Sequence, residues 1–232
     1  MAVWFVLFTG CGDEAPPPVK TESAVSSPPA VSAQEAGRVE AVVLGTGAAT
    51  GDYYRIGDAI AGMLNMRQST YRLQCAVEAT GGSLVNVHAV LSGDLQFGLT
   101  RARWNYEAAK GLGIWQARGA QKELRSVFSL PFAPAPSSDI PEARDPVGNP
   151  SETPPPGDPA MAALVGTTTL VTSAKVPERI VYNFTRAVFE NLSKLQALHP
   201  AFAGATPQRM LQGLSAPIHP GALRYYKEAG WM

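Results

Sequence analysis

Two short glycine-rich runs carry the polar residues of this sequence that are best placed to bind a ligand. The first is GTGAATGDYY, residues 45–54, and the second is EATGGSLVN, residues 78–86. Each run follows a mostly apolar stretch and precedes a segment with helical periodicity, which is typical of a junction between a strand and a helix. The free backbone N–H groups and the dipole at a helix N-terminus suit a small anion such as a carboxylate.

The first run matches neither of the common nucleotide-binding loops. A dinucleotide fingerprint needs a third glycine where Thr50 stands, and a phosphate loop needs Lys where Asp52 stands. Two interpretations remain, a small-anion site and a tight turn in which Asp52 caps the following helix. The second run favours a site, because polar glycine loops at the same end of neighbouring parallel strands point into one crevice. We therefore predict a small-molecule site.

The elements that position these loops alternate along the chain. Strands are predicted over residues 38–44, 72–77, 95–100 and 124–130. Helices are predicted over residues 52–66, 83–91 and 103–110. This alternation is typical of βαβ units, in which helices cover a parallel sheet, so the fold class is α/β. After residue 163 the sequence predicts a strand, one long amphipathic helix with Pro177 in its first turn, and short helices over residues 207–212 and 220–229.

Two stretches lack any such pattern. Half of the 20 prolines lie between Pro131 and Pro159. Residues 132–162 have no hydrophobic periodicity, so we expect a proline-rich disordered segment there. Residues 12–37 are rich in Pro, Ser, Ala and charge and cannot build a core, so we expect a flexible tether.

The N-terminal residues resemble an export signal. The apolar run over residues 2–8 is too short to span a bilayer, and Phe8-Thr9-Gly10-Cys11 resembles a bacterial lipobox. We therefore predict a lipoprotein-type signal over residues 1–11, with Cys11 lipidated and the folded part held near a membrane surface. No Lys or Arg precedes the run. This leaves two alternatives, a signal that begins further upstream or an apolar terminus without a targeting role.

The composition argues against several other classes of protein. Nineteen basic residues balance nineteen acidic ones and form no basic stripe, which argues against a nucleic-acid partner. The three histidines lack the spacing of zinc ligands, and no G-x-S-x-G elbow is present. Cys75 alternates with apolar residues and has no activating base, as expected of a small buried residue. We predict no metal, no cofactor and no enzymatic activity.

Three blocks of sequence occur in the order GTGAATGDYYRIGDAI, ATGGSLVNVHAVLSGDLQFGL and GLSAPIHPGALRYYKEAG. Together these blocks resemble the TAXI family, the solute-binding receptors of TRAP (tripartite ATP-independent periplasmic) transporters. The resemblance covers about residues 38–130 and 163–230. It implies a periplasmic-binding-protein-like (type II) fold whose two α/β lobes close on a solute. It also implies a small anionic solute, a glutamate- or dicarboxylate-like organic acid, and an ion-driven TRAP-type membrane permease as partner.

Together the junctions and the resemblance nominate eight ligand-binding residues: Thr46, Gly47, Thr50, Tyr53, Gly82, Ser83, Asn86 and Arg101. Arg101 has two interpretations, shared by Arg103. An arginine that faces the cleft offers a bidentate donor to a carboxylate. An arginine that faces solvent carries no information about the ligand.

The sequence departs from the TAXI pattern in three places. Ala48 occupies a glycine position, the run Thr100-Arg101-Ala102-Arg103-Trp104 is unlike the family's, and residues 132–162 stand where the family has most of its second lobe. We therefore expect one ligand-binding α/β lobe over residues 38–131, and a returning strand with C-terminal helices over residues 163–232 that packs on it. Two functions follow: a lipid-anchored extracytoplasmic receptor, or a degenerate or truncated lipoprotein remnant or scaffold without transport function.

Overall fold

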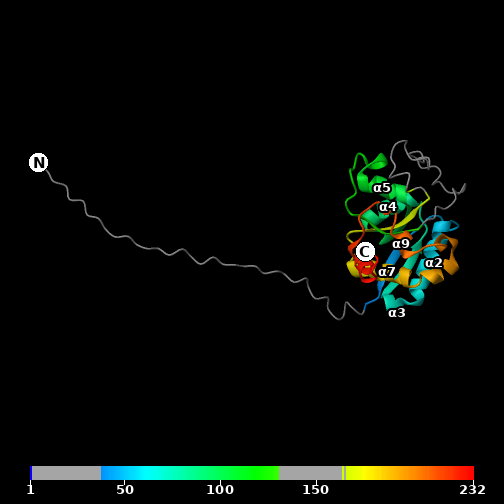
Figure 1. The fold of residues 1–232 in the computed structure, drawn as a ribbon. Coiled ribbons are helices and arrows are strands. Elements are labelled where there is room, and N and C mark those ends of the chain that lie inside the picture. Colours follow the sequence, from blue (N-terminus) through cyan, green and yellow to red (C-terminus); the bar gives the residue numbers. More distant parts are fainter. Residues whose placement is uncertain (2–37, 131–163, 165) are drawn as a thin grey trace. The chain divides into compact units, whose positions relative to one another are not determined.

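The computed structural model describes residue 1, residues 38–130, residue 164 and residues 166–232 (Figure 1). The predicted signal with Cys11, the tether and the proline-rich segment over residues 132–162 lie outside these residues. From residue 38 onward, the described chain belongs to one compact unit.

A five-stranded sheet is the centre of the fold. Its strands are β1 (Glu40–Gly45), β2 (Leu73–Glu78), β3 (Phe97–Arg101), β4 (Leu124–Leu130) and β5 (Thr168–Ser173), in the order β2-β1-β3-β5-β4. β1 pairs in parallel with β2 and β3, whereas β5 lies antiparallel between β3 and β4. The sheet is therefore mixed, where the alternation of strands and helices predicted a parallel one. The chain leaves β4 at Leu130 and re-enters the sheet at its register partner Thr168, which reverses the strand direction.

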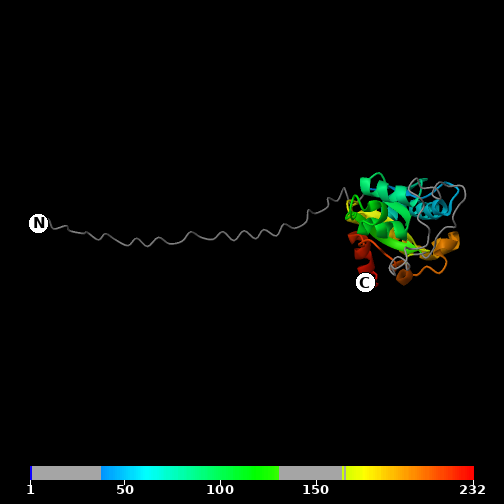
Figure 2. The same cartoon turned by 90° about the horizontal axis from the view of Figure 1, so that it is seen from above.

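Helices cover both faces of this sheet (Figures 1 and 2). They are α2 (Asp52–Met66), α3 (Gln68–Tyr71), α4 (Ser83–Ser92), α5 (Ala102–Lys110), α7 (Glu178–Glu190), α8 (Leu192–Leu198), α9 (Pro207–Met210) and α10 (Pro220–Glu228), with 3-10 turns η1 (Gly113–Trp115) and η3 (Pro200–Phe202). The larger core joins α2, α7, α8 and α10 to one face, where Phe97 and Phe184 stack with ring centroids 4.1 Å apart. The smaller core joins α4 and α5 to the other face.

At each edge of the sheet, hydrogen bonds to one strand residue occupy backbone groups that a further strand would otherwise pair with. At the β2 edge, the side chain of Asn65 accepts from the N–H of Cys75 and donates to its C=O, both at 2.8 Å. At the β4 edge, the N–H of Ser126 donates to Pro217 and the N–H of His219 donates to Ser126, each at 3.0 Å. Burial of Cys75 at the β2 edge raises the pKa of its thiol to about 12.

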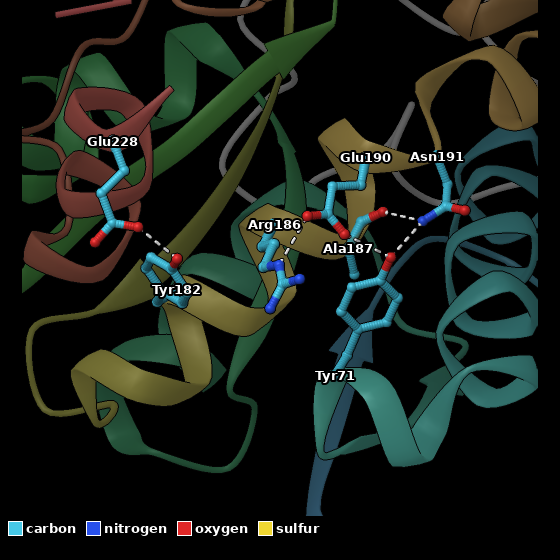
Figure 3. Close-up of polar contacts among 7 residues, drawn as sticks. All are labelled: Tyr71, Tyr182, Arg186, Ala187, Glu190, Asn191 and Glu228. Atoms are coloured by element: carbon cyan, nitrogen blue, oxygen red, sulfur yellow. Dashed lines mark hydrogen bonds and ion pairs between the residues drawn. The ribbon is translucent and has the colours of Figure 1, made fainter. Parts of the chain in front are cut away.

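The predicted long C-terminal helix is broken into α7 and α8 at Asn191. The Nδ2 of Asn191 donates to the backbone oxygen of Ala187 and to the hydroxyl of Tyr71, at 2.9 and 2.7 Å (Figure 3). A side chain that donates to the backbone oxygen one turn earlier competes with the backbone N–H for that oxygen, and this competition ends α7. Figure 3 also shows that Tyr71 donates to Glu190 at 3.0 Å, which ties α3 to the end of α7. Burial is the main cause of the raised pKa of Tyr71.

Polar contacts also join α7 to α10. The hydroxyl of Tyr182 donates to Glu228 at 2.5 Å, and Arg186 pairs with Glu190 at 2.8 Å on the same face of α7 (Figure 3). These side chains are partly exposed, so each pair contributes at most about 1 kcal/mol. The apolar contacts of the larger core therefore hold α7 in place. The polar contacts determine which side chains lie beside one another on its surface.

Candidate functional site

The two glycine runs and the start of α5 meet at one edge of the sheet. Because β1, β2 and β3 are parallel, their carboxyl ends share that edge. The first run leads from β1 to α2, the second from β2 to α4, and Arg101 ends β3 directly before α5. The structure thus brings the nominated residues to the same end of three neighbouring strands.

The first run is folded back onto the end of β2. Thr46 is fully buried, and both its N–H and its Oγ1 donate to the backbone oxygen of Glu78, at 3.0 and 2.7 Å. A Cβ at Gly45 would lie 2.7 Å from Oδ1 of Asn86, so only glycine fits there. This glycine serves the close packing of β1 against α4, which is a structural role.

The second run is tied to the first by the side chain of Asn86. Its Nδ2 donates to the backbone oxygens of Thr46 and Leu99, at 2.6 and 2.8 Å. Its Oδ1 accepts from Thr80, whose hydroxyl also lies 2.8 Å from the backbone oxygen of Thr46. Asn86 therefore holds the ends of β1 and β3 and the second loop together. Its nominated contact with a solute stays a prediction.

Ser83 joins the starts of α4 and α5. It is fully buried as the first residue of α4, and its Oγ accepts the N–H of Arg101 at 3.1 Å. Gly82, the N-cap of α4, has a φ of 94°, a left-handed value that a residue with a Cβ adopts only with strain. Neither α4 nor α5 has a side-chain cap or an acidic residue in its first turn. Both helix N-termini therefore keep their positive electrostatic character.

The remaining nominated residues differ in exposure. Tyr53 is 3% exposed, and its hydroxyl lies 3.1 Å from Oγ1 of Thr168, so it reaches β5 from α2. Gly47 is buried beside Tyr53, whereas Thr50 is exposed to solvent. Among the nominated residues of the first run, Thr50 is thus the one with an exposed polar side chain, while Tyr53 links α2 to the strand that returns after β4.

The two arginines of the β3–α5 junction have separate places. Arg103 pairs through Nε with Oε1 of Glu107 at 2.8 Å, and the side chain of Glu107 is 6% exposed. This pair lies along α5, one turn apart. Arg101 is half-buried at the N-cap of α5. Contact of Arg101 with a solute carboxylate stays a prediction.

Sequence reasoning missed a buried polar group beneath α5. The hydroxyl of Thr100 lies 2.8 Å from Oδ1 of Asn105 and 3.1 Å from the backbone oxygen of Thr169. Both Nδ2 of Asn105 and Oγ1 of Thr169 are buried without a hydrogen-bond partner. No local signal marks this group, because strands β3 and β5 and helix α5 bring it together only in the fold. Sequence reasoning also missed Thr80, but this residue lies within the second glycine run, which is a local signal that could have found it.

The histidines hold structural positions. Nδ1 of His199 accepts the N–H of Ala201, and Nδ1 of His219 accepts the N–H of Gly221, each at 3.1 Å, so the two rings cap the starts of η3 and α10. The ring of His88 lies 4.6 Å from that of Trp115. Within the described ranges, no group of three His, Cys, Asp or Glu side chains is placed to hold a metal ion. Among the helices described, none is both long and apolar enough to cross a membrane.

The family comparison agrees with this fold. The sequence matches the model of the NMT1-like family over residues 44–137 and 146–230, well over half of the chain. The chain belongs to the NMT1-like family. The matched residues include both glycine runs, strands β2 to β5 and the end of β1. The five-stranded sheet flanked by helices is a periplasmic-binding-protein-like lobe, as the sequence predicted.

Membership of the NMT1-like family indicates an extracytoplasmic solute-binding function. The family is non-enzymatic, and its members bind a small solute for a transporter. This membership specifies neither the TAXI subgroup, nor a TRAP-type permease, nor a class of solute.

Proposed function

We propose that this NMT1-like protein is the solute receptor of a TRAP-type transporter and captures a small organic acid, glutamate- or dicarboxylate-like. The solute carboxylate binds where α4 and α5 begin. Ser83, Gly82 and Arg101 lie at these two helix starts, and the first glycine run forms the neighbouring wall. The receptor then delivers the solute to an ion-driven permease in the membrane.

One observation carries this proposal: two helix N-termini, linked by the hydrogen bond from Arg101 to Ser83, begin side by side without capping side chains. The uncapped N–H groups and aligned dipoles favour an anion at this place. The loops around them are held by buried hydrogen bonds to Asn86, so the donors need little reorganisation when a solute binds.

A thermal-shift screen of the purified chain against small monocarboxylates, dicarboxylates and amino acids tests the proposal. A ligand that binds only the folded state stabilises it by about 2.7 kcal/mol at one hundred times its Kd. We expect a selective rise in Tm with one class of acid. Ser83→Ala should weaken that binding by about 1–3 kcal/mol, because a buried hydrogen bond at the helix starts is lost. Ser92→Ala, an exposed change on the same helix, serves as the control.

The alternative function is a remnant or scaffold without transport, and one observation favours it. The chain leaves β4 at Leu130 and returns at Thr168, and the residues between them are fewer than the roughly 50 of the smallest ordinary domains. A receptor of this family closes two lobes on its solute, so a single lobe would hold the solute weakly. A cooperative melt with no shift for any acid would favour the remnant.

We also propose that Cys11 carries a lipid and anchors the protein outside the cytoplasm. The Phe8–Cys11 sequence resembles a lipobox, and the family is extracytoplasmic. Cys11→Ser should move the protein from the membrane fraction to the soluble fraction of the producing bacterium. Recovery of both forms in the same fraction would contradict the anchor.

A further inference from the structure

The folded lobe carries an excess of positive charge that the whole sequence hides. The sequence balances nineteen basic residues with nineteen acidic ones. Within the described residues, seventeen are Lys or Arg and ten are Asp or Glu, so the lobe has an excess of seven positive charges. A surface with such an excess attracts anionic partners.

Six of these cations gather at the end of the sheet opposite the proposed solute site, where β1 and β2 begin. The N–H of Glu40 donates to the backbone oxygen of Arg72 at 2.9 Å, which brings the starts of the two strands together. The N–H of Ala174 donates to Glu123 at 2.8 Å, which joins the turn after β5 to the start of β4 at the same end. The six cations, which form the basic end, are spread along the sequence: Arg38, Arg67, Arg72, Lys122, Lys175 and Arg179.

Acidic residues offset half of this charge. Arg179 pairs with Glu40 at 2.6 Å, and this hydrogen bond is the main cause of the lowered pKa of Glu40, with a contribution from the charge of Arg38. Asp94 and Glu123 also lie near the starts of their strands. With these three carboxylates included, the basic end keeps an excess of three positive charges. Five of its six cations are exposed, so a partner can reach them.

Arg72 occupies a backbone position that glycine adopts at less cost. Its φ is 54°, and it is the non-glycine residue with a positive φ among those described. It is the C-cap of α3, where glycine is the usual residue in the left-handed conformation. The side chain of Arg72 is exposed, so the core does not require it there. An arginine kept at such a position indicates a role for its charge at the surface.

The chain also enters the lobe at the basic end. Figure 1 shows the start of the lobe beside α3, as the hydrogen bond from Glu40 to Arg72 requires. Residues 12–37 separate this point from Cys11, the proposed site of the lipid. Even when fully extended, these residues span at most about 90 Å. A lipid on Cys11 would therefore keep the basic end close to a membrane surface.

We propose that the basic end docks on the anionic phospholipid surface of the membrane, which turns the solute edge of the sheet away from the bilayer. The attraction to anionic lipid rests on the lobe alone, whereas its place beside the cell's own membrane rests on the proposed anchor at Cys11. Each Lys or Arg near such a surface contributes about fivefold to binding. An excess of three charges therefore gives a reversible contact, which salt weakens by screening.

Co-sedimentation of the full chain with vesicles tests this surface without the anchor. The chain carries Cys11→Ser, so that no lipid is attached. The vesicles contain phosphatidylcholine alone or equal parts of phosphatidylcholine and phosphatidylglycerol. We expect binding to the anionic vesicles to exceed binding to the neutral ones by about a hundredfold at low salt, and this ratio to fall at high salt. The apolar N-terminal residues are common to every protein compared, so their contribution cancels in the ratio.

Two double variants that each lose two positive charges locate the contact. Arg38→Gln with Arg72→Gly should lower the ratio to about fivefold, because one excess charge is left at the basic end. Arg55→Gln with Arg209→Gln should keep the ratio, because Arg55 lies in the first turn of α2 and Arg209 in α9, whose Met210 contacts Ser129 near the end of β4. Arg72→Gly alone should raise Tm, since glycine suits a φ of 54°, so its weaker binding would not reflect unfolding.

Equal losses in the two double variants would overturn the proposal, because net charge and not the basic end would then account for the binding. A wild-type ratio near one at low salt would overturn it as well. Neither result depends on lipidation of Cys11 or on solute binding, which are measured by the fractionation and the thermal-shift screen described above.

Discussion

The carboxamide nitrogen of Asn86 lies 2.6 Å from the backbone oxygen of Thr46, which is 40 residues earlier in the chain. The same nitrogen donates to Leu99, and neither Thr46 nor Asn86 is accessible to solvent. One side chain thus connects the ends of β1 and β3 under the proposed site. The main role of Asn86 is to hold the loops that would contact a solute.

Asn86→Ala should lower the free energy of unfolding by about 2–4 kcal/mol, because the buried backbone oxygens of Thr46 and Leu99 each lose the hydrogen bond from Nδ2, and the hydroxyl of Thr80 loses one of its two acceptors. Urea denaturation monitored by circular dichroism measures the change. Ser92→Ala on the same helix should stay within about 0.5 kcal/mol of wild type, since Ser92 is exposed. An Asn86→Ala variant as stable as this control would show that the connection contributes nothing.

Two glycines of α2 should respond to alanine in opposite directions. A Cβ at Gly57 would lie 2.5 Å from Cγ2 of Thr46 and 3.3 Å from Val77, so Gly57→Ala pushes α2 off the first glycine run and lowers Tm. A Cβ at Gly62 meets nothing within 4 Å, so Gly62→Ala should stabilise the helix by about 0.5–1 kcal/mol. Differential scanning calorimetry of both variants tests the pair. A stabilising Gly57→Ala would contradict the close approach of α2 to Thr46.

His219 should make the fold sensitive to acid. Its Nδ1 accepts the N–H of Gly221 and its Nε2 lies 3.1 Å from the oxygen of Val176, so the neutral ring with the proton on Nε2 fits both contacts. Burial lowers the pKa of His219 in the folded state, with Val176 and Glu178 opposing and Arg125 assisting. The stabilisation is therefore complete above the unfolded pKa of about 6.5 and is lost as the pH falls through the lower folded pKa.

Tm measured from pH 7.5 down to pH 5 should fall more steeply for wild type than for His219→Asn. Asparagine keeps an N-cap oxygen for the N–H of Gly221 but does not titrate. His88 and His199 also have pKa values lowered mainly by burial, so the variant should retain part of the pH dependence. Parallel curves for the two proteins would mean that His219 takes no part in it.

Local pattern was sufficient for several elements of the fold. The helix over residues 52–66 was predicted with the bounds of α2, because Tyr53, Ile56 and Ile60 repeat with the helical period and enter the larger core. The break at Asn191 was missed, because it depends on Tyr71, which is 120 residues away in sequence. The antiparallel direction of β5 was likewise beyond a local pattern, since strand direction is set by where the chain re-enters the sheet.

The candidate site was likewise predicted from the sequence only in part. The glycine runs placed Ser83 and Asn86 at the start of a helix beside the first loop, because a strand–turn–helix junction is a local feature. The link from Tyr53 to Thr168 spans 115 residues and had no sequence signal. The group of Thr100, Asn105 and Thr169 was missed for the same reason: its members lie on three elements that only the sheet brings together.

That buried group gives a last prediction. The hydroxyl of Thr169 is fully buried and has no hydrogen-bond partner, so the fold bears the cost of its lost hydration. Thr169→Val keeps the shape of the side chain, removes the hydroxyl and favours the strand, and should raise the free energy of unfolding by about 1 kcal/mol. Thr172→Val, on the same strand, should lower it by a similar amount, because the buried hydroxyl of Thr172 donates to Gln96 at 2.7 Å. Urea denaturation of both variants measures these two changes. Equal losses of unfolding free energy would mean that the hydroxyl of Thr169 has a hydrogen-bond partner in solution.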